Sequence, residues 1–269
     1  MANPSSVIGA PVWRVEGADK ASGRAVYGAD VHFPDTLWGK ILRSPYPHAR
    51  ILNIDTSKAR QVAGVKAIVT GKEEANHYQG KSIRDIPVLC WDKVRYVGDK
   101  VAAVAGESRD AAEEAINLIE VEYEELPAVF DVLEAMKPGA PILHDDAPSY
   151  DGAPADIMVG PNSNVVNKLI WGKGDIEKGF AEADLVLDHT FRIPIHHQGY
   201  LEPQSFLVRI EDDGTVNAWA STKGPFGTRA QFAKAAGIPA SQIRIQAVHV
   251  GADFGGKSGA GELPICYFL

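Results

Sequence analysis

The residues whose types and spacing best support chemistry are the eight from Gly251 to Ser258, Gly-Ala-Asp-Phe-Gly-Gly-Lys-Ser. The string satisfies G-x-x-x-x-G-K-[ST], the phosphate-binding loop pattern, and it follows a predicted strand as that pattern requires. In such loops the glycines let backbone N–H groups approach an anion, and the lysine adds a positive charge. A nucleotide-binding protein is therefore one hypothesis, and a purely structural glycine-rich turn is a second.

Three features of the sequence oppose nucleotide hydrolysis at this loop. Asp253 places a carboxylate inside the cradle, where it would repel phosphates. Gly259, Gly261 and Pro264 are poor residues for the helix that should follow. The short stretch after Ser258 also leaves no room for an acidic strand that could hold magnesium. The phosphate-binding loop is thus an alternative and not the main interpretation.

A second group of residues has the chemical types of metal ligands. His189, His196, His197 and Glu202 lie close together in the sequence. Adjacent residues of a strand point to opposite faces of a sheet, so His196 and His197 seldom bind one ion. The sequence favours hydrogen-bonded histidines over a zinc site, and it predicts no direct metal ligand in this chain.

The composition excludes several classes of protein. The chain has 27 Lys and Arg against 35 Asp and Glu, a net charge of −8, which argues against a nucleic-acid partner. Cys90 and Cys266 are too few for an iron–sulfur cluster or a disulfide framework. The first residues do not read as a signal peptide, and no apolar stretch approaches the roughly 20 residues that span a bilayer. A cytoplasmic protein without a membrane span is expected.

Proline and glycine divide the chain into two predicted α+β units. The predicted segments are an N-terminal extension over 1–18, a first unit over 19–125, a Pro-rich connector over 126–160 and a second unit over 161–269. In the first unit we expect strands over 37–42, 67–69, 101–105 and 120–124, and a helix capped by Ser108 that carries Ala112, Ile116 and Ile119 on one face.

The second unit contains the elements that must position the loop. A hairpin is predicted from 206–210 and 215–220, because Asp212-Asp213-Gly214 is a turn signal. A helix follows over 225–236 and ends at Gly237, and a strand over 243–250 leads into the loop. The uncharged run 263–269 needs a surface to bury against, and it is interpreted as an interrupted core element.

The loop closely resembles the G-G-x-F-G-G-K segment of the molybdenum-binding subunits of the xanthine dehydrogenase/aldehyde oxidase/CO dehydrogenase family. Further segments resemble that family in the same order along the chain, and together they span about residue 19 to the C-terminus. These segments are Lys20–Asp30, Arg43–Ile51, Val97–Ala102, His197–Pro203, and Ser221–Phe226 with the following helix and Gly237–Pro239. Six ordered segments identify the chain as the N-terminal part of such a large subunit.

The resemblance implies a fold and an activity. The first unit would be the α/β hammerhead domain, and the second would be the first part of an α+β molybdopterin-binding domain. The family's molybdenum hydroxylases are oxidoreductases that oxidise an aldehyde, an N-heterocycle or a similar carbon centre with oxygen from water. The implied cofactor is molybdenum–molybdopterin in the cytosine dinucleotide form. The implied partners are the remaining molybdopterin-binding polypeptide, an iron–sulfur subunit that carries 2Fe-2S clusters and a subunit that carries FAD.

The resemblance also assigns roles to residues. The cofactor-binding positions are Lys223, Phe254, Gly255 and Gly256, and the substrate-lining positions are Phe254, Ser258 and Glu202. Lys223 stands where the family often has a glutamine that hydrogen-bonds a molybdenum oxo ligand. Ser258 stands where purine oxidisers carry a glutamate, which argues against xanthine as the substrate.

No residue of this chain corresponds to the family's catalytic base, a glutamate far toward the C-terminus of a longer subunit. The chain is therefore expected to supply one wall of the active site and to be inactive alone. A non-catalytic assembly module is a further alternative.

Overall fold

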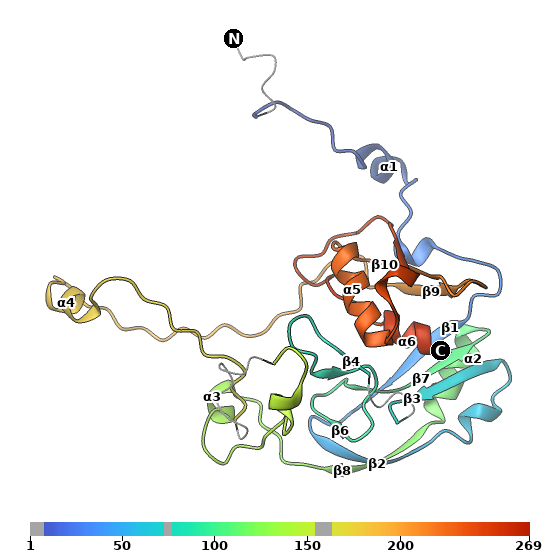
Figure 1. Ribbon diagram of the computed structural model, residues 1–269, viewed down its shortest axis with the longest axis horizontal. Helices are drawn as coiled ribbons and strands as arrows, with labels where there is room; N and C mark the ends of the chain where they lie inside the picture. Colours follow the sequence, from blue (N-terminus) through green and yellow to red (C-terminus); the bar gives the residue numbers. More distant parts are fainter. Residues whose placement is uncertain (1–7, 73–76, 154–162) are drawn as a thin grey trace.

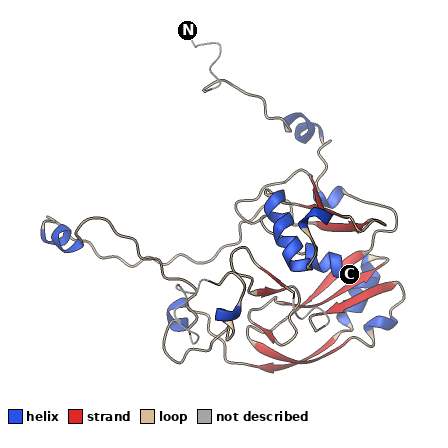
Figure 2. Ribbon diagram, viewed as in Figure 1, coloured by secondary structure: helices blue, strands red, loops and turns tan. Residues whose placement is uncertain are grey.

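A computed structural model describes residues 8–72, 77–153 and 163–269. Residues 1–7 of the predicted extension, residues 154–160 of the predicted connector and residues 161–162 lie outside the described residues. The chain folds as an α+β structure in which small sheets are covered by short helices (Figure 2). This agrees with the fold class expected from the sequence.

A three-stranded antiparallel sheet forms the centre of the first unit. Strand β7 (Lys100–Gly106) lies between β1 (Trp38–Arg43) and β3 (Val65–Thr70). All seven residues of β7 are buried, as the unbroken apolar run over 101–105 predicts for a strand covered on both faces. The prediction of these three strands is confirmed.

Helix α2 (Arg109–Asn117) covers one face of this sheet. The Ser108 hydroxyl caps it by accepting the N–H of Ala111 at 3.1 Å. Ala112 and Ile116 are buried against the sheet, and Ile119 is buried just after the helix ends. The predicted capping residue and apolar face are therefore confirmed.

A second sheet of the first unit has the strand order β6-β2-β8 (Lys93–Val94, Ala49–Asp55 and Glu120–Glu125). Strand β8 alternates exposed glutamates with half-buried Val121 and Tyr123, as its sequence predicts. A two-stranded ribbon of β4 (Tyr78–Gln79) and β5 (Ile86–Pro87) completes the unit.

The second unit is a sheet with the strand order β11-β10-β9 and one long helix. Strands β9 (Phe206–Ile210) and β10 (Val216–Ala220) form the predicted antiparallel hairpin. Helix α5 (Pro225–Ala236) then crosses to β11 (Ile243–Gln246), which is parallel to β10. Strand β11 is shorter than the predicted 243–250, because after Gln246 the chain leaves the sheet and makes only an isolated bridge from His249 to Tyr27.

Helix α6 (Leu263–Phe268) joins the two units. Leu263 packs into the core under α5, and Ile265 packs with Val69 and Ala103 of the first unit. Glu262, at the start of the helix, pairs with Lys100 at 2.9 Å and with Arg43 at 3.2 Å. The uncharged run is thus a helix whose first three residues are buried, which confirms the expectation that it is a core element.

Two segments project from the compact body (Figure 1). One contains α1 (Gly17–Ser22) near the N-terminus. The other, here called the arm, comprises residues 166–199, all of them exposed, and carries α4 (Ile176–Ala181) at its tip. The remaining short helices are η1 (Gly28–Asp30), η2 (Ala59–Gln61), α3 (Val132–Ala135), η3 (Ala147–Ser149) and η4 (Ala240–Gln242).

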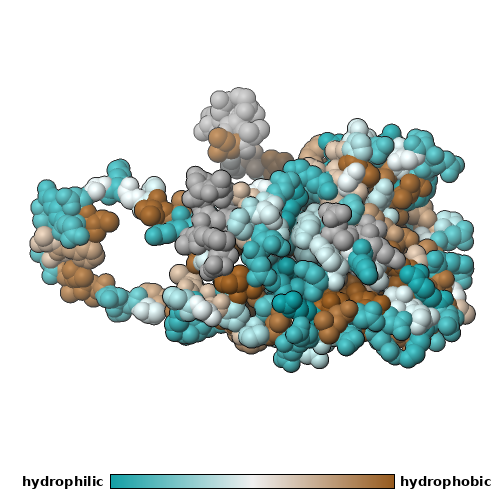
Figure 3. Space-filling view, turned by 60° about the horizontal axis from the view of Figure 1, so that its bottom comes forward, coloured by the Kyte–Doolittle hydropathy of each residue, from teal (hydrophilic) through white to brown (hydrophobic). Residues whose placement is uncertain are grey.

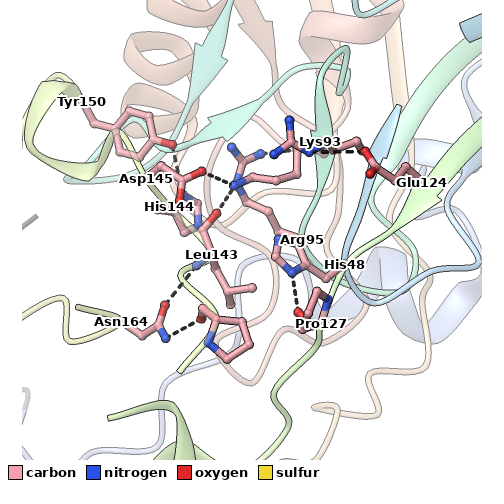
Figure 4. Close-up of polar contacts among 12 residues, drawn as sticks. His48, Lys93, Arg95, Glu124, Pro127, Leu143, His144, Asp145, Tyr150 and Asn164 are labelled. Carbon is pink, nitrogen blue, oxygen red and sulfur yellow. Dashed lines mark hydrogen bonds and ion pairs between the residues drawn. The ribbon is translucent and has the colours of Figure 1, made fainter. Parts of the chain in front are cut away.

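The described part of the Pro-rich connector is held on the first unit by polar contacts. Arg95 Nε donates to the carbonyl of Leu143 at 3.0 Å, and Lys93 pairs with Asp145 at 2.6 Å (Figure 4). The Asn164 side chain accepts the N–H of Leu143 at 3.1 Å and donates to nearby carbonyls. These polar contacts hold an irregular segment that leaves large apolar side chains such as Phe130 and Val132 exposed.

Candidate functional site

The Gly251–Ser258 loop leaves β11 and lies between two segments of the second unit. Gln204 Nε2 donates to the carbonyl of Gly256 at 2.9 Å, and the N–H of Lys223 donates to the carbonyl of Lys257 at 3.3 Å. Three loop residues have left-handed backbone conformations, with φ values of 75° at Ala252, 46° at Phe254 and 90° at Gly255. Such conformations are unfavourable for residues with a Cβ, so surrounding contacts must hold them.

Asp253 supplies contacts inside the loop. Its carboxylate accepts the N–H of Gly255 at 3.1 Å and, through the other oxygen, the N–H of Lys257. Lys223 Nζ lies 2.6 Å from Asp253 Oδ2, and this hydrogen bond from Lys223 is the main reason that the pKa of Asp253 is lowered. Two amides of the loop, those of Gly255 and Lys257, are thus occupied by the chain's own carboxylate.

Lys257 is turned away from the exposed side of the loop. Its side chain is 0% exposed, its Nζ lies 2.6 Å from Glu202 Oε2, and the Tyr200 ring centroid is 4.8 Å away. A lysine that binds the phosphates of a nucleotide must instead reach the ligand. With Asp253 accepting two of the loop amides and Lys257 buried, this geometry gives the phosphate-binding alternative no support.

Glu202 receives hydrogen bonds on both carboxylate oxygens. Oε2 accepts the N–H of Gly251 at 2.6 Å as well as Lys257 Nζ, and Oε1 accepts the Ser221 hydroxyl at 3.1 Å. Burial by itself would raise the pKa of Glu202, but the hydrogen bonds from Lys257, Gly251 and Ser221 outweigh it and lower the pKa. The carboxylate is therefore ionised and held by three donors at neutral pH.

Three of the predicted cofactor-binding residues, Lys223, Phe254 and Gly255, are exposed. Phe254 is 74% exposed, Lys223 and Gly255 are also exposed, and no heavy atom lies within 4 Å of a Cβ built on Gly255. Within the described residues the N–H of Phe254 has no hydrogen-bond partner. An open glycine beside a free amide fits a flat group that approaches the backbone closely.

The other predicted site residues occupy different depths. Ser258 is exposed, whereas Gly256 is half-buried because it packs against Tyr200. Glu202 lies beneath the loop with a side chain that is 12% exposed. The structure thus brings all the predicted site residues to one loop and its support, with Glu202 on the supporting side.

Sequence reasoning named Glu202 as a site residue but missed Tyr200, which also shapes the loop from below. A Cβ on Gly251 would lie 2.6 Å from Glu202 Cβ, and one on Gly256 would lie 2.5 Å from Tyr200 Cε1. These two glycines are required by contacts with the 200–202 segment of the same chain. The glycine spacing itself was the available signal, because glycine is needed wherever another segment approaches the backbone this closely.

The histidines considered as metal ligands lie on or near the arm. His197 Nδ1 accepts the N–H of Gly199 at 3.1 Å, and its ring lies 4.9 Å from that of Tyr200. Among the residues that the structure describes, no group of three His, Cys, Asp or Glu side chains is arranged to hold a metal ion. In the same part of the chain, no helix has the length and apolar character needed to cross a bilayer.

Comparison with known proteins matches both units. The family described as aldehyde oxidase and xanthine dehydrogenase, a/b hammerhead domain, matches residues 22–127. The molybdopterin cofactor-binding domain family matches residues 159–269. Together the two matches cover most of the chain in the order that the sequence predicts.

Two curated relatives are similar along nearly the whole chain. A probable xanthine dehydrogenase subunit of Bacillus subtilis (strain 168) is 39% identical over 246 residues, which cover 91% of this chain and 31% of the relative. The nicotinate dehydrogenase large molybdopterin subunit of Eubacterium barkeri is 32% identical over 262 residues, which cover 96% of this chain and 57% of the relative.

Solved structures give the same result. A Cu,Mo-CO dehydrogenase in its carbon monoxide reduced state aligns with a TM-score of 0.81 and 32% identity, covering 96% of this chain and 33% of that one. Quinoline 2-oxidoreductase from Pseudomonas putida 86 aligns with a TM-score of 0.82 and 29% identity, covering 97% and 33%. The chain therefore spans about a third to somewhat over half of the length of these proteins, and it belongs to the molybdopterin-binding large subunits of the xanthine dehydrogenase/aldehyde oxidase/CO dehydrogenase family.

Proposed function

We propose that this chain is part of a molybdenum hydroxylase and supplies one wall of its molybdenum–pterin site. The relatives are oxidoreductases by name, and they are similar to this chain across both units. The observation that carries the proposal is the loop, which exposes Phe254, the open side of Gly255 and an amide without a partner among the described residues. When bound, the molybdenum–pterin group would supply the redox chemistry that adds oxygen from water to a carbon centre.

In this proposal the residues of this chain orient the cofactor and the substrate, and they exclude water. Gly255 and Gly256 let the backbone approach the cofactor, and Phe254 gives an apolar wall for a flat substrate. Lys223, held by Asp253, donates a hydrogen bond toward the cofactor, although as a lysine it cannot accept one. Ser258 and Glu202 complete the substrate side, Glu202 through the loop that it supports. The catalytic base is proposed to lie outside this chain.

The proposal extends to the assembly. The cofactor would be in the cytosine dinucleotide form, and 2Fe-2S and FAD would be carried by partner subunits beside the remaining molybdopterin-binding polypeptide. The complex would be cytoplasmic. The division of this chain into an extension over 1–18, a hammerhead domain over 19–125, a connector over 126–160 and a cofactor-binding portion over 161–269 is proposed with it.

A matched pair of glycine variants tests the function. Gly255 and Gly214 both have positive φ, 90° and 81°, and a Cβ on either meets no heavy atom within 4 Å. Substitution by valine therefore strains both backbones similarly, but only Gly255→Val places atoms on the proposed cofactor surface. In the purified complex we expect near-stoichiometric molybdenum in Gly214→Val and at least a tenfold loss of bound molybdenum in Gly255→Val, measured by mass spectrometry of the metal.

Activity on aldehydes, N-heterocycles and carbon monoxide is measured on the same samples. The oxidation rate should follow the molybdenum content. Equal molybdenum in both variants would exclude this loop as the cofactor surface, and a wild-type complex without molybdenum would exclude the proposed function.

A further inference from the structure

One carboxylate holds the loop at both of its ends. Glu202 Oε2 accepts the N–H of Gly251, the first loop residue, and the Nζ of Lys257, the seventh, each at 2.6 Å. The N–H of Glu202 in turn donates to the carbonyl of Gly251 at 3.2 Å. The exposed loop residues therefore lie between two ends that both bind the Glu202 side chain.

The ion pair is shielded from water. The Lys257 side chain is 0% exposed and that of Glu202 is 12% exposed. The Tyr200 ring covers the ammonium group at 4.8 Å, a cation–π distance, and the same ring fits against the backbone of Gly256. Removing either charge would leave the other buried without a partner, so the two residues depend on each other.

Neither member of the pair reaches the exposed side of the loop. Lys257 Nζ points to Glu202, and the second carboxylate oxygen is used by Ser221, which directly follows β10. The pair thus ties the loop to the sheet and to the 200–202 segment at one point. The attraction within such a buried pair is largely offset by the cost of removing both charges from water, so its net contribution to stability is small.

We propose that Glu202 and Lys257 are positioning residues, which hold Phe254 and Gly255 in the left-handed conformation that docks the cofactor, without touching the cofactor themselves. This inference rests on the proposed function. It assigns to Glu202 a role under the loop, and to the lysine of the G-K-S string a role in which it binds no ligand.

Hydrogen–deuterium exchange of the purified complex, with and without cofactor, tests the inference directly. In Glu202→Gln and in Lys257→Met we expect amides in peptides covering 251–258 to exchange at least tenfold faster than in the wild type. Peptides covering β10 should exchange as before. Wild-type exchange of the loop in both single variants would overturn the proposal, whatever the molybdenum content.

The double variant Glu202→Gln/Lys257→Met separates positioning from folding. It removes both charges together, so its melting temperature should recover most of the loss seen in the single variants. Its loop amides should nevertheless stay at least tenfold faster than in the wild type. If the double variant recovers the melting temperature and its loop amides exchange as in the wild type, the two charges serve only to neutralise each other. That result would refute the positioning role.

Two controls accompany these variants. Glu134→Gln breaks an exposed ion pair between Glu134 and Lys137. The N–O distance of that pair is 2.7 Å, similar to that of the Glu202–Lys257 pair, and its loss should leave loop exchange unchanged. Val216→Ala removes buried atoms from β10 and lowers the melting temperature without touching the pair. Loop exchange in Val216→Ala that rises as much as in Glu202→Gln would mean that general destabilisation explains the effect, and the inference would fail.

A separate measurement tests whether the Glu202–Lys257 pair affects cofactor binding. In the loaded complex, Glu202→Gln should change the Mo(V) electron paramagnetic resonance spectrum or lower the molybdenum content, while Glu134→Gln changes neither. A loosened loop with a wild-type spectrum and content would overturn the positioning role, while the Gly255→Val comparison would still decide the proposed function. The two failures are therefore distinguishable.

Discussion

At the scale of single residues, two carboxylates determine the form of the loop. Asp253 accepts loop amides from within, and Glu202 binds both ends from below. Each is paired with a lysine, Lys223 at the surface and Lys257 in the interior. The loop is consequently defined by its own charges before any ligand binds, which distinguishes it from a phosphate cradle whose amides remain available for the ligand.

The first prediction concerns pH. The pKa values of Glu202 and Asp253 are both lowered from ordinary values of 4.5 and 3.8. A lowered folded-state pKa stabilises the folded loop above the unfolded-state value, and this contribution disappears as the pH falls through the folded-state value. Loop protection in hydrogen exchange, corrected for the intrinsic rate, should be constant above about pH 5 and should fall below about pH 4.

The control for this prediction is the double variant Asp253→Asn/Glu202→Gln. Its loop amides should be equally poorly protected above about pH 5 and below about pH 4. Acid sensitivity of the same size in the double variant would mean that other groups are responsible.

A second prediction concerns Lys223. Lys223→Gln removes the charge next to Asp253 but keeps a hydrogen-bond donor and adds an acceptor. Because the Lys223 side chain is exposed to water, the free energy of unfolding should change little. The turnover of the complex should change while its melting temperature stays within about 2 degrees, as measured by calorimetry and steady-state kinetics. A change of the melting temperature alone would assign Lys223 a purely structural role.

At the scale of elements, helix α6 packs against both units. Leu263 and Ile265 are buried in two different cores. Leu263→Ala should lower the free energy of unfolding by about 2 to 5 kcal/mol, because it leaves a cavity. Leu169→Ala in the arm, where the side chain is exposed, should change it by less than about 0.5 kcal/mol in the same urea titration. Equal effects of the two variants would contradict the placement of α6.

Elements with strong local signals could be predicted from the sequence. The bounds of α5 agree with the predicted 225–236, because proline at the first position and glycine after the last define a helix locally. The cap of α2 and the alternation of β8 were predictable for the same reason. These features depend on residues within one or two turns of each other.

Features that depend on long-range contacts could not be predicted. The 126–153 segment reads as an irregular connector, yet Arg95 and Lys93 hold it from 48 and 52 residues away. In the site, a glutamate and a lysine 55 residues apart form the buried pair. The glycines that permit close contact with the loop can be read from the sequence, but the 200–202 segment that makes this contact cannot.

At the scale of the whole molecule, a compact body carries a long exposed arm. Figure 3 shows apolar side chains along the arm, and those with large exposed areas include Leu169, Trp171, Phe191, Ile193 and Ile195. The body, by contrast, buries apolar residues in clusters within each unit and in one cluster shared between them. The arm therefore contributes little to the stability of this chain.

Limited proteolysis checks this contrast. The first cleavages of the purified chain should fall within 166–199, because none of these residues is buried. The described connector residues 126–153, although equally irregular, should resist longer because of the contacts made by Arg95 and Asn164. Cleavage of the connector before the arm would contradict the docked arrangement in Figure 4.

The sequence of the arm has a consequence for biosynthesis. From Leu185 to Ile195 every second residue except His189 is apolar, and this stretch has no strand partner among the described residues. An extended chain with one apolar edge and unused backbone donors is what chaperones bind and what aggregates form from. The yield of soluble protein in a cell should therefore depend on how quickly this stretch is covered after translation.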